Sequence, residues 1–105
     1  MSLSRIEQLR MYLKEEPDDV FLNYTMALEL KSSGELDKSL EYLNKTLSLQ
    51  SQNIPALYQK GEVLSKLNRI EEAISVLKEG IQCCILQENT KSKNEFEQAL
   101  FLLED

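Results

Sequence analysis

The sequence repeats itself after 34 residues, in the size of its side chains rather than in their identity. Five apolar residues return at apolar positions after this shift, so that Leu30, Leu36, Leu40, Leu43 and Leu47 become Leu64, Ile70, Ile74, Leu77 and Ile81. Tyr24 returns as Tyr58, and the turn former Gly34 returns as Asn68. A period of this length predicts a two-helix unit that is used more than once, with each unit burying its apolar face against the next.

The composition is that of a folded, helical protein. Apolar residues make up 42% of the 105 residues, whereas only three Gly and two Pro occur. Such a content excludes disorder and favours helix. The longest apolar run is far shorter than the roughly 20 residues of a membrane span, and the N-terminus lacks the apolar stretch of a signal peptide. We therefore expect one all-helical domain in the cytoplasm, without attachment to a membrane.

Apolar residues at helical spacing, with turn formers between the runs, predict six helical segments. They cover residues 4–15, 20–32, 36–49, 55–67, 70–86 and 90–103. We expect a single domain, 1–105, with a half-repeat helix at 4–17, repeats at 20–53 and 54–87, and a capping helix at 90–103. The last segment is out of phase with the 34-residue period, so we assign it to the end of the stack.

Small residues at fixed places predict close contacts between helices. Ala27 returns as Gly61, and a small residue there lets the second helix of each pair approach the first. Gly80 lies inside a helical segment at a cost of about 1 kcal/mol relative to Ala, which suggests close contact with the following helix. Gly34 and Asn68 are of the types that accept a left-handed backbone most readily, so both are expected at turns.

Charge and residue content exclude several classes of function. The 18 acidic residues outnumber the 12 basic ones, and a net charge of −6 without any Lys/Arg cluster argues against nucleic-acid binding. The sequence has no His, no Gly-rich phosphate loop and no paired nucleophile and base. We therefore expect neither an enzyme nor a bound cofactor.

The two cysteines, Cys83 and Cys84, are adjacent. Neighbours on a helix point about 100° apart, so these thiols cannot form a disulfide with each other without breaking the helix. They also cannot form a metal site alone, because the chain has no His and no further Cys. We expect one buried and one half-exposed thiol in a reducing compartment.

These residues resemble the tetratricopeptide repeat family, whose 34-residue unit has a small residue at position 8, Gly near 15, Ala at 20, a large apolar residue at 24 and Pro at 32. Counting from position 20 of this chain gives Ala27, Gly34, Ser39, Leu43 and Ser51, and counting from position 54 gives Gly61, Asn68, Ala73, Leu77 and Ile85. Pro17 corresponds to position 32 of a preceding, truncated unit. The sequence departs from the family at Ser51 and Ile85, where Pro is missing, and at Asn23 and Leu57, where Trp is common.

The resemblance covers residues 4–87 and implies an α-solenoid of antiparallel helix pairs, with about five helices and a C-terminal capping helix. It also implies an adaptor or scaffold that binds a peptide or helix of a partner protein in a concave groove. The groove positions carried over to this chain are Phe21, Tyr24, Leu28, Lys31, Ser32, Pro55, Tyr58, Glu62, Ser65 and Lys66. Family members that hold acidic tails have Lys and Asn at the positions of Tyr24 and Leu28, so an acidic-tail ligand is not expected.

Two alternatives remain open from the sequence. Tyr24 and Tyr58 either form an aromatic ladder along the groove or pack between helices with their hydroxyl groups in water. The chain either binds a separate partner or associates with itself as a homodimer through an apolar edge at Leu100, Phe101 and Leu102. Because Phe101 and Leu102 are adjacent on the last helix, at least one of them is expected to be exposed.

Overall fold

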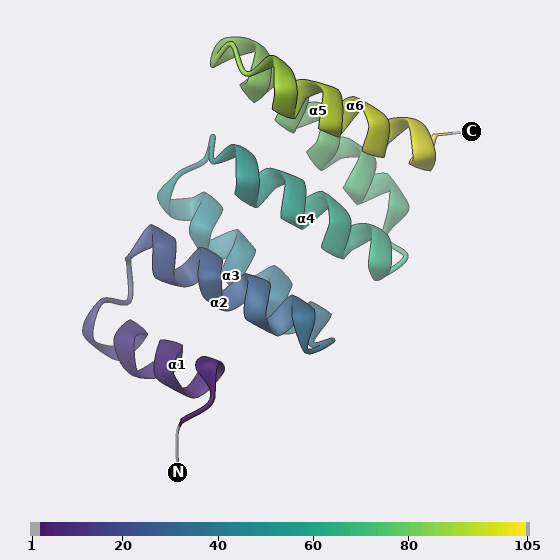
Figure 1. Cartoon of the computed structure of the whole chain (residues 1–105). Coiled ribbons are helices and arrows are strands. Elements are labelled where there is room, and N and C mark those ends of the chain that lie inside the picture. Colours follow the sequence, from purple (N-terminus) through teal and green to yellow (C-terminus); the bar gives the residue numbers. More distant parts are fainter. Residues whose placement is uncertain (1–2, 105) are drawn as a thin grey trace. The chain divides into compact units, whose positions relative to one another are not determined.

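The computed structural model describes residues 3–104, which form six helices and no strand (Figure 1). The helices are α1 (Arg5–Glu15), α2 (Val20–Ser32), α3 (Leu36–Leu49), α4 (Ile54–Lys66), α5 (Ile70–Leu86) and α6 (Thr90–Leu103). They form two compact units, the first ending at Ser51 and the second beginning at Gln52. The all-α repeat fold that the 34-residue period predicts is confirmed, with α6 as the sixth helix after the five of the repeats.

Side chains cap the first turn of four of the helices, which explains why these helices begin where they do. The capping residues are Ser4 before α1, Asp19 before α2, Asn53 before α4 and Asn89 before α6. Asp19, for example, accepts a hydrogen bond of 2.8 Å from the backbone N–H of Leu22. Each cap satisfies an N–H group that has no partner within its own helix.

Three helices end in the same left-handed turn. Gly34, Asn68 and Glu88 have φ angles of 83°, 61° and 55°, and they follow α2, α4 and α5. In each turn the next residue donates its backbone N–H to a carbonyl five residues back, as Arg69 does to Leu64 over 2.9 Å. The expected turns at Gly34 and Asn68 are confirmed, whereas the turn at Glu88 was not predicted because Glu seldom adopts this conformation.

In the first unit, α2 contacts both α1 and α3. Leu9 of α1 packs against Met26 and Leu30 of α2 in a buried cluster. The hydroxyl of Ser39 in α3 donates a buried hydrogen bond of 2.7 Å to the carbonyl oxygen of Ala27 in α2. This bond requires the two helices to approach closely, and the small side chains of Ala27 and Ser39 permit that approach.

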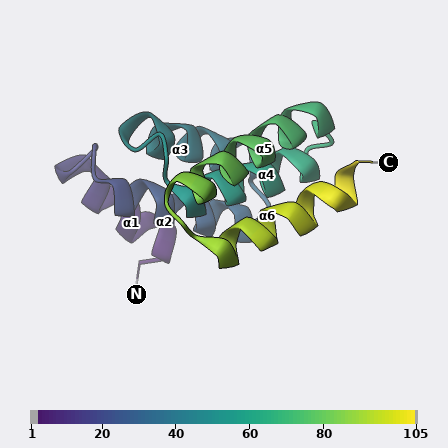
Figure 2. The same ribbon diagram turned by 90° about the horizontal axis from the view of Figure 1, so that it is seen from above.

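In the second unit, α5 contacts both α4 and α6, and α5 and α6 run side by side (Figure 2). A Cβ atom built on Gly61 would lie 2.6 Å from Cδ2 of Leu77, so α4 and α5 meet at this glycine. A Cβ atom built on Gly80 would overlap the ring of Phe96 in α6. Both close contacts expected from the sequence are therefore confirmed.

The expectation that one cysteine would be half-exposed is wrong, because Cys83 and Cys84 are only 6% and 1% exposed. The physical reason is that α5 is covered by α4 on one side and by α6 on another, so two positions about 100° apart are both covered. Burial raises the pKa of both thiols. The negative charge of Glu79 raises the pKa of Cys83 further.

Candidate binding site

Three of the groove residues predicted on α4 line one cleft. Tyr58, Glu62 and Ser65 are spaced four and three residues apart, so they lie on one face of the helix. This face borders a cleft of about 450 Å³, which we call the α4–α6 cleft. Its lining residues are Tyr58, Gly61, Glu62 and Ser65 of α4, Leu77 of α5, and Glu95, Gln98, Ala99, Leu102 and Leu103 of α6.

The middle of the α4–α6 cleft is apolar. Gly61 contributes no side chain, and the Leu77 side chain of α5 occupies the space in front of it. Ala99 and Leu103 of α6 line the other wall and are half-buried. An apolar side chain of a ligand that enters this part of the cleft would leave water, which contributes roughly 1.5–3 kcal/mol for a Leu or Phe.

The polar groups of the α4–α6 cleft are mostly negative or neutral. Glu62 and Glu95 stand on α4 and α6. Burial raises the pKa of the Tyr58 phenol, and the charges of Glu62 and Glu95 raise it further. The phenol therefore stays protonated at neutral pH and can act as a hydrogen-bond donor, while Gln98 supplies an amide. Two carboxylates in one cleft disfavour an acidic ligand.

Tyr58 also has a structural role. Its ring contacts the ring of Phe96 edge-to-face, with the ring centroids 5.2 Å apart and the planes at 87°. Phe96 is almost fully buried on α6. Tyr58 thus packs between helices, which is one of the two roles that the sequence left open, and it also lines the cleft. The aromatic ladder of Tyr24 and Tyr58 stays a prediction.

The remaining groove residues lie elsewhere. Lys66 is exposed and does not line the α4–α6 cleft, because it points about 100° away from Ser65. Phe21, Tyr24, Leu28 and Lys31 belong to the first unit, where their spacing places them on one face of α2. Phe21 is exposed and borders a shallow hollow formed with Tyr12, Leu22 and the carboxylates of Glu15, Glu16 and Asp19. Tyr24, Leu28 and Lys31 are half-buried.

Sequence reasoning missed the α6 wall of the cleft. The groove positions were carried over only to the first helices of the two repeats, and α6 is out of phase with the 34-residue period. A usable signal did exist: Glu95, Gln98 and Leu102 are spaced three and four residues apart, which places them on one face of a helix. Gly80 then indicated that this helix packs against α5.

Within residues 3–104, no three His, Cys, Asp or Glu side chains are grouped so that they could hold a metal ion. Over the same residues, every helix is too short or too polar to cross a bilayer. The α4–α6 cleft, with its apolar middle and polar rim, thus has the general character of a binding site.

Comparison with known structures identifies the fold. A tetratricopeptide repeat domain protein from Salinibacter ruber is similar with a TM-score of 0.78 and 22% identity, over 84% of this chain and 89% of that chain. The TPR2B domain of yeast Sti1, in a complex with pHsp70, is similar with a TM-score of 0.86 and 15% identity, over 93% of this chain and 78% of that chain. YrrB, described as a TPR protein with an unusual peptide-binding site, is similar with a TM-score of 0.66 and 20% identity, over 94% of this chain and 58% of that chain. At these identities the likeness shows the fold.

Comparison with sequence families is more specific. No curated protein sequence matches the chain. The family model described as anaphase-promoting complex, cyclosome, subunit 3 matches residues 4–80, which is most of the chain and includes both predicted repeats up to the middle of α5. The chain is therefore a tetratricopeptide repeat protein, and it belongs to the family of anaphase-promoting complex (cyclosome) subunit 3.

Proposed function

We propose that this chain is a protein-interaction module that holds a peptide or helix of a partner protein in the α4–α6 cleft. The observation that carries the proposal is that Tyr58, Glu62 and Ser65, chosen from the sequence as groove residues, line one cleft in the structure. Two proteins of the same fold support it, since the TPR2B domain of Sti1 was solved in a complex with pHsp70 and YrrB has a peptide-binding site.

The chemistry of the cleft narrows the ligand. The apolar middle, between Gly61, Leu77 and Leu103, suits one apolar side chain of a partner. The carboxylates of Glu62 and Glu95 accept hydrogen bonds and repel acidic groups. A neutral or basic segment with at least one apolar anchor therefore fits better than an acidic tail. The net charge of −6 acts in the same direction at longer range.

The first unit supplies a second candidate contact surface on α2. Phe21, Tyr24, Leu28 and Lys31 share one face of this helix, and Phe21 is the most exposed of the four. Partner binding at this face of α2 is a proposal separate from binding in the α4–α6 cleft. The module needs no catalytic group for either contact, and we infer a non-catalytic, cytoplasmic adaptor.

A blocking substitution tests the α4–α6 cleft. Peptides are first selected from a random display library on the full chain, and their affinity is then measured by fluorescence anisotropy. Ser65→Trp places a large side chain in the cleft mouth and should weaken binding at least about tenfold, or 1.4 kcal/mol. The matched control is Ser75→Trp, on an exposed position of α5, which should bind like the unmodified chain. Equal binding by the Ser65 variant would exclude the cleft.

A further inference from the structure

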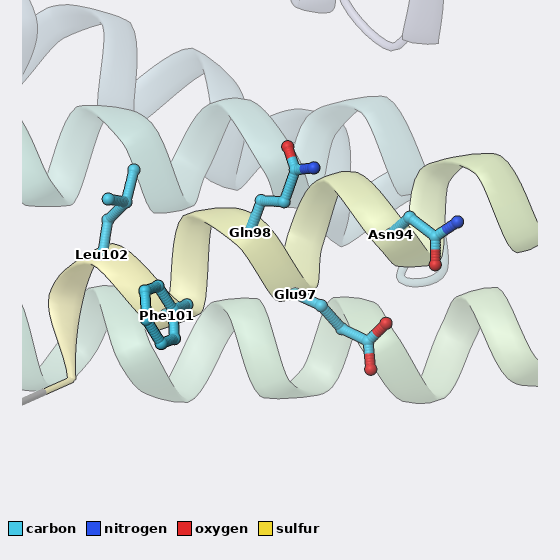
Figure 3. Close-up of a pocket in the computed structure, with 5 residues that line it drawn as sticks. All are labelled: Asn94, Glu97, Gln98, Phe101 and Leu102. Carbon is cyan, nitrogen blue, oxygen red and sulfur yellow. The ribbon is translucent and has the colours of Figure 1, made fainter.

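The outward side of α6 exposes two adjacent apolar side chains. Among the large apolar residues of the described part, Leu102 and Phe101 are the most exposed, at 82% and 78%. Of the three residues expected at an exposed edge, Phe101 and Leu102 are exposed, whereas Leu100 is half-buried. With Asn94, Glu97 and Gln98 they surround an open depression of about 600 Å³ (Figure 3). We call these five residues the outer face of α6.

We propose that the outer face of α6 binds the same face of a second copy of this chain, with the two α6 helices antiparallel. The two-fold axis of this dimer passes beside Gln98. The proposal does not depend on peptide binding, because Phe101 lies outside the α4–α6 cleft. It concerns a different kind of partner, while Gln98 and Leu102 border both the outer face of α6 and the α4–α6 cleft.

The charges along α6 favour a second copy in this orientation. Lys93 lies near the start of the helix, and Glu104 is the first residue after its end. They are 11 residues apart, about three turns, so they lie along the same edge of the outer face. In an antiparallel pair Lys93 of each copy faces Glu104 of the other, whereas a parallel pair would align like charges.

The present partners of these two charges can be exchanged at little cost. Lys93 lies 3.7 Å from Glu97, and Glu104 lies 3.6 Å from Lys78. All four side chains are at least one third exposed, and ion pairs of this kind contribute little to stability. New pairs across the dimer therefore compete with weak pairs within each chain.

The same alignment places apolar groups against hollows. When Lys93 and Glu104 face each other, Phe101 of one copy is level with the space between Asn94 and Gln98 of the other. Those two residues line the depression. Each copy thus supplies both the projecting ring and the hollow that receives it, as an isologous interface requires.

The size of the surface predicts a weak dimer. Each copy contributes two large apolar side chains, and an aromatic side chain buries about 150–250 Å². The buried area therefore stays below the roughly 800 Å² per partner of a stable interface. We therefore expect association that depends on protein concentration. Sedimentation equilibrium of the full chain over a wide concentration range measures it directly.

Phe101→Glu tests the surface. It should raise the dimer dissociation constant at least about tenfold while leaving the helical circular dichroism unchanged, because the ring is exposed. Leu86→Glu is the matched control, since Leu86 is 71% exposed at the end of α5 and lies outside the outer face. It should associate like the unmodified chain.

Charge reversal tests the orientation. Lys93→Glu and Glu104→Lys should each weaken association, and an equimolar mixture of the two variants should restore it, because both pairs across the mixed dimer are again opposite in sign. The proposal is overturned if the unmodified chain stays monomeric at every concentration. It is equally overturned if Phe101→Glu associates normally, or if the mixture associates no better than either variant alone.

Discussion

Two glycines set how closely the helices of the second unit approach one another, but they differ in what they face. Gly61 faces the methyl end of Leu77, and Gly80 faces the ring of Phe96. The nearest Leu77 atom, Cδ2, is at the end of a flexible side chain. The Phe96 ring is almost fully buried and is held edge-to-face by Tyr58, so Gly80 is the less replaceable of the two.

Gly80→Ala is expected to lower the free energy of unfolding by roughly 1–3 kcal/mol, because the added methyl group overlaps the Phe96 ring. This loss exceeds the gain in helix propensity of about 1 kcal/mol. Urea denaturation measures the difference, and the variant Phe96→Leu, combined with Gly80→Ala, should recover part of it. A more stable Gly80→Ala variant would show that the ring is not the constraint.

The left-handed turn at Glu88 stores backbone strain, since its φ of 55° is unfavourable for a residue with a Cβ atom. Glu88→Gly should therefore raise the free energy of unfolding by about 1 kcal/mol. The reciprocal control is Gly34→Ala, where φ is 83° and the added Cβ would contact nothing within 4 Å. The free energy of unfolding of Gly34→Ala should fall by about 1 kcal/mol through the backbone alone. An unchanged stability in both variants would contradict this explanation.

At the scale of helices, local signals in the sequence placed the elements well. The ends of α2, α3, α5 and α6 match the expected segments. The helix α1 differs by one residue at its start, and α4 differs by one residue at each end. The reason is that side-chain caps such as Asp19 and turn residues such as Gly34 act within a few residues of themselves. A periodic apolar pattern supplies the rest.

The sequence could not give what depends on the position of α6. Its phase differs from that of the repeats, so neither the second wall of the α4–α6 cleft nor the covering of Cys83 followed from the 34-residue period. Both features arise from packing between α5 and α6, which only Gly80 indicated in advance. Three of the predicted groove residues of α4 line the α4–α6 cleft, and its wall on α6 was not predicted. Partner binding at these residues stays a prediction.

Burial of the two thiols of α5 makes stability depend on alkaline pH. The pKa of each thiol is raised by folding, so the unfolded chain loses these protons at a lower pH than the folded chain. Their contribution to stability is fully present below the ordinary thiol pKa of about 8.5 and is lost as the pH rises through the raised value.

We expect the free energy of unfolding to fall above about pH 8.5, as measured by urea denaturation in a pH series. The variant with both Cys83→Ala and Cys84→Ala should show a shallower fall over the same range, whatever its stability at neutral pH. The native thiols should also react slowly with a thiol reagent at pH 7, because thiolate is the reactive form. If the free energy of unfolding falls equally steeply with pH in both proteins, the two thiols are not the cause of the fall.

At the scale of the whole molecule, the division into a half-repeat, two repeats and a capping helix within one domain, 1–105, stays a prediction. Two of the proposed contact surfaces lie in the second unit, on α4 and α6. One side of α6 closes the α4–α6 cleft with Glu95 and Ala99, and the outer face carries Phe101. A single helix thus borders both proposed contact surfaces.

The most direct test of the central claim is a titration of the ¹⁵N-labelled chain with a library-selected peptide, followed by backbone amide chemical shifts. We predict that the largest changes fall on residues of the cleft from both helices, Tyr58, Glu62 and Ser65 of α4 together with Glu95 and Ala99 of α6. Changes confined to the exposed side of α5 around Ser75, with these five amides unmoved, would contradict the account.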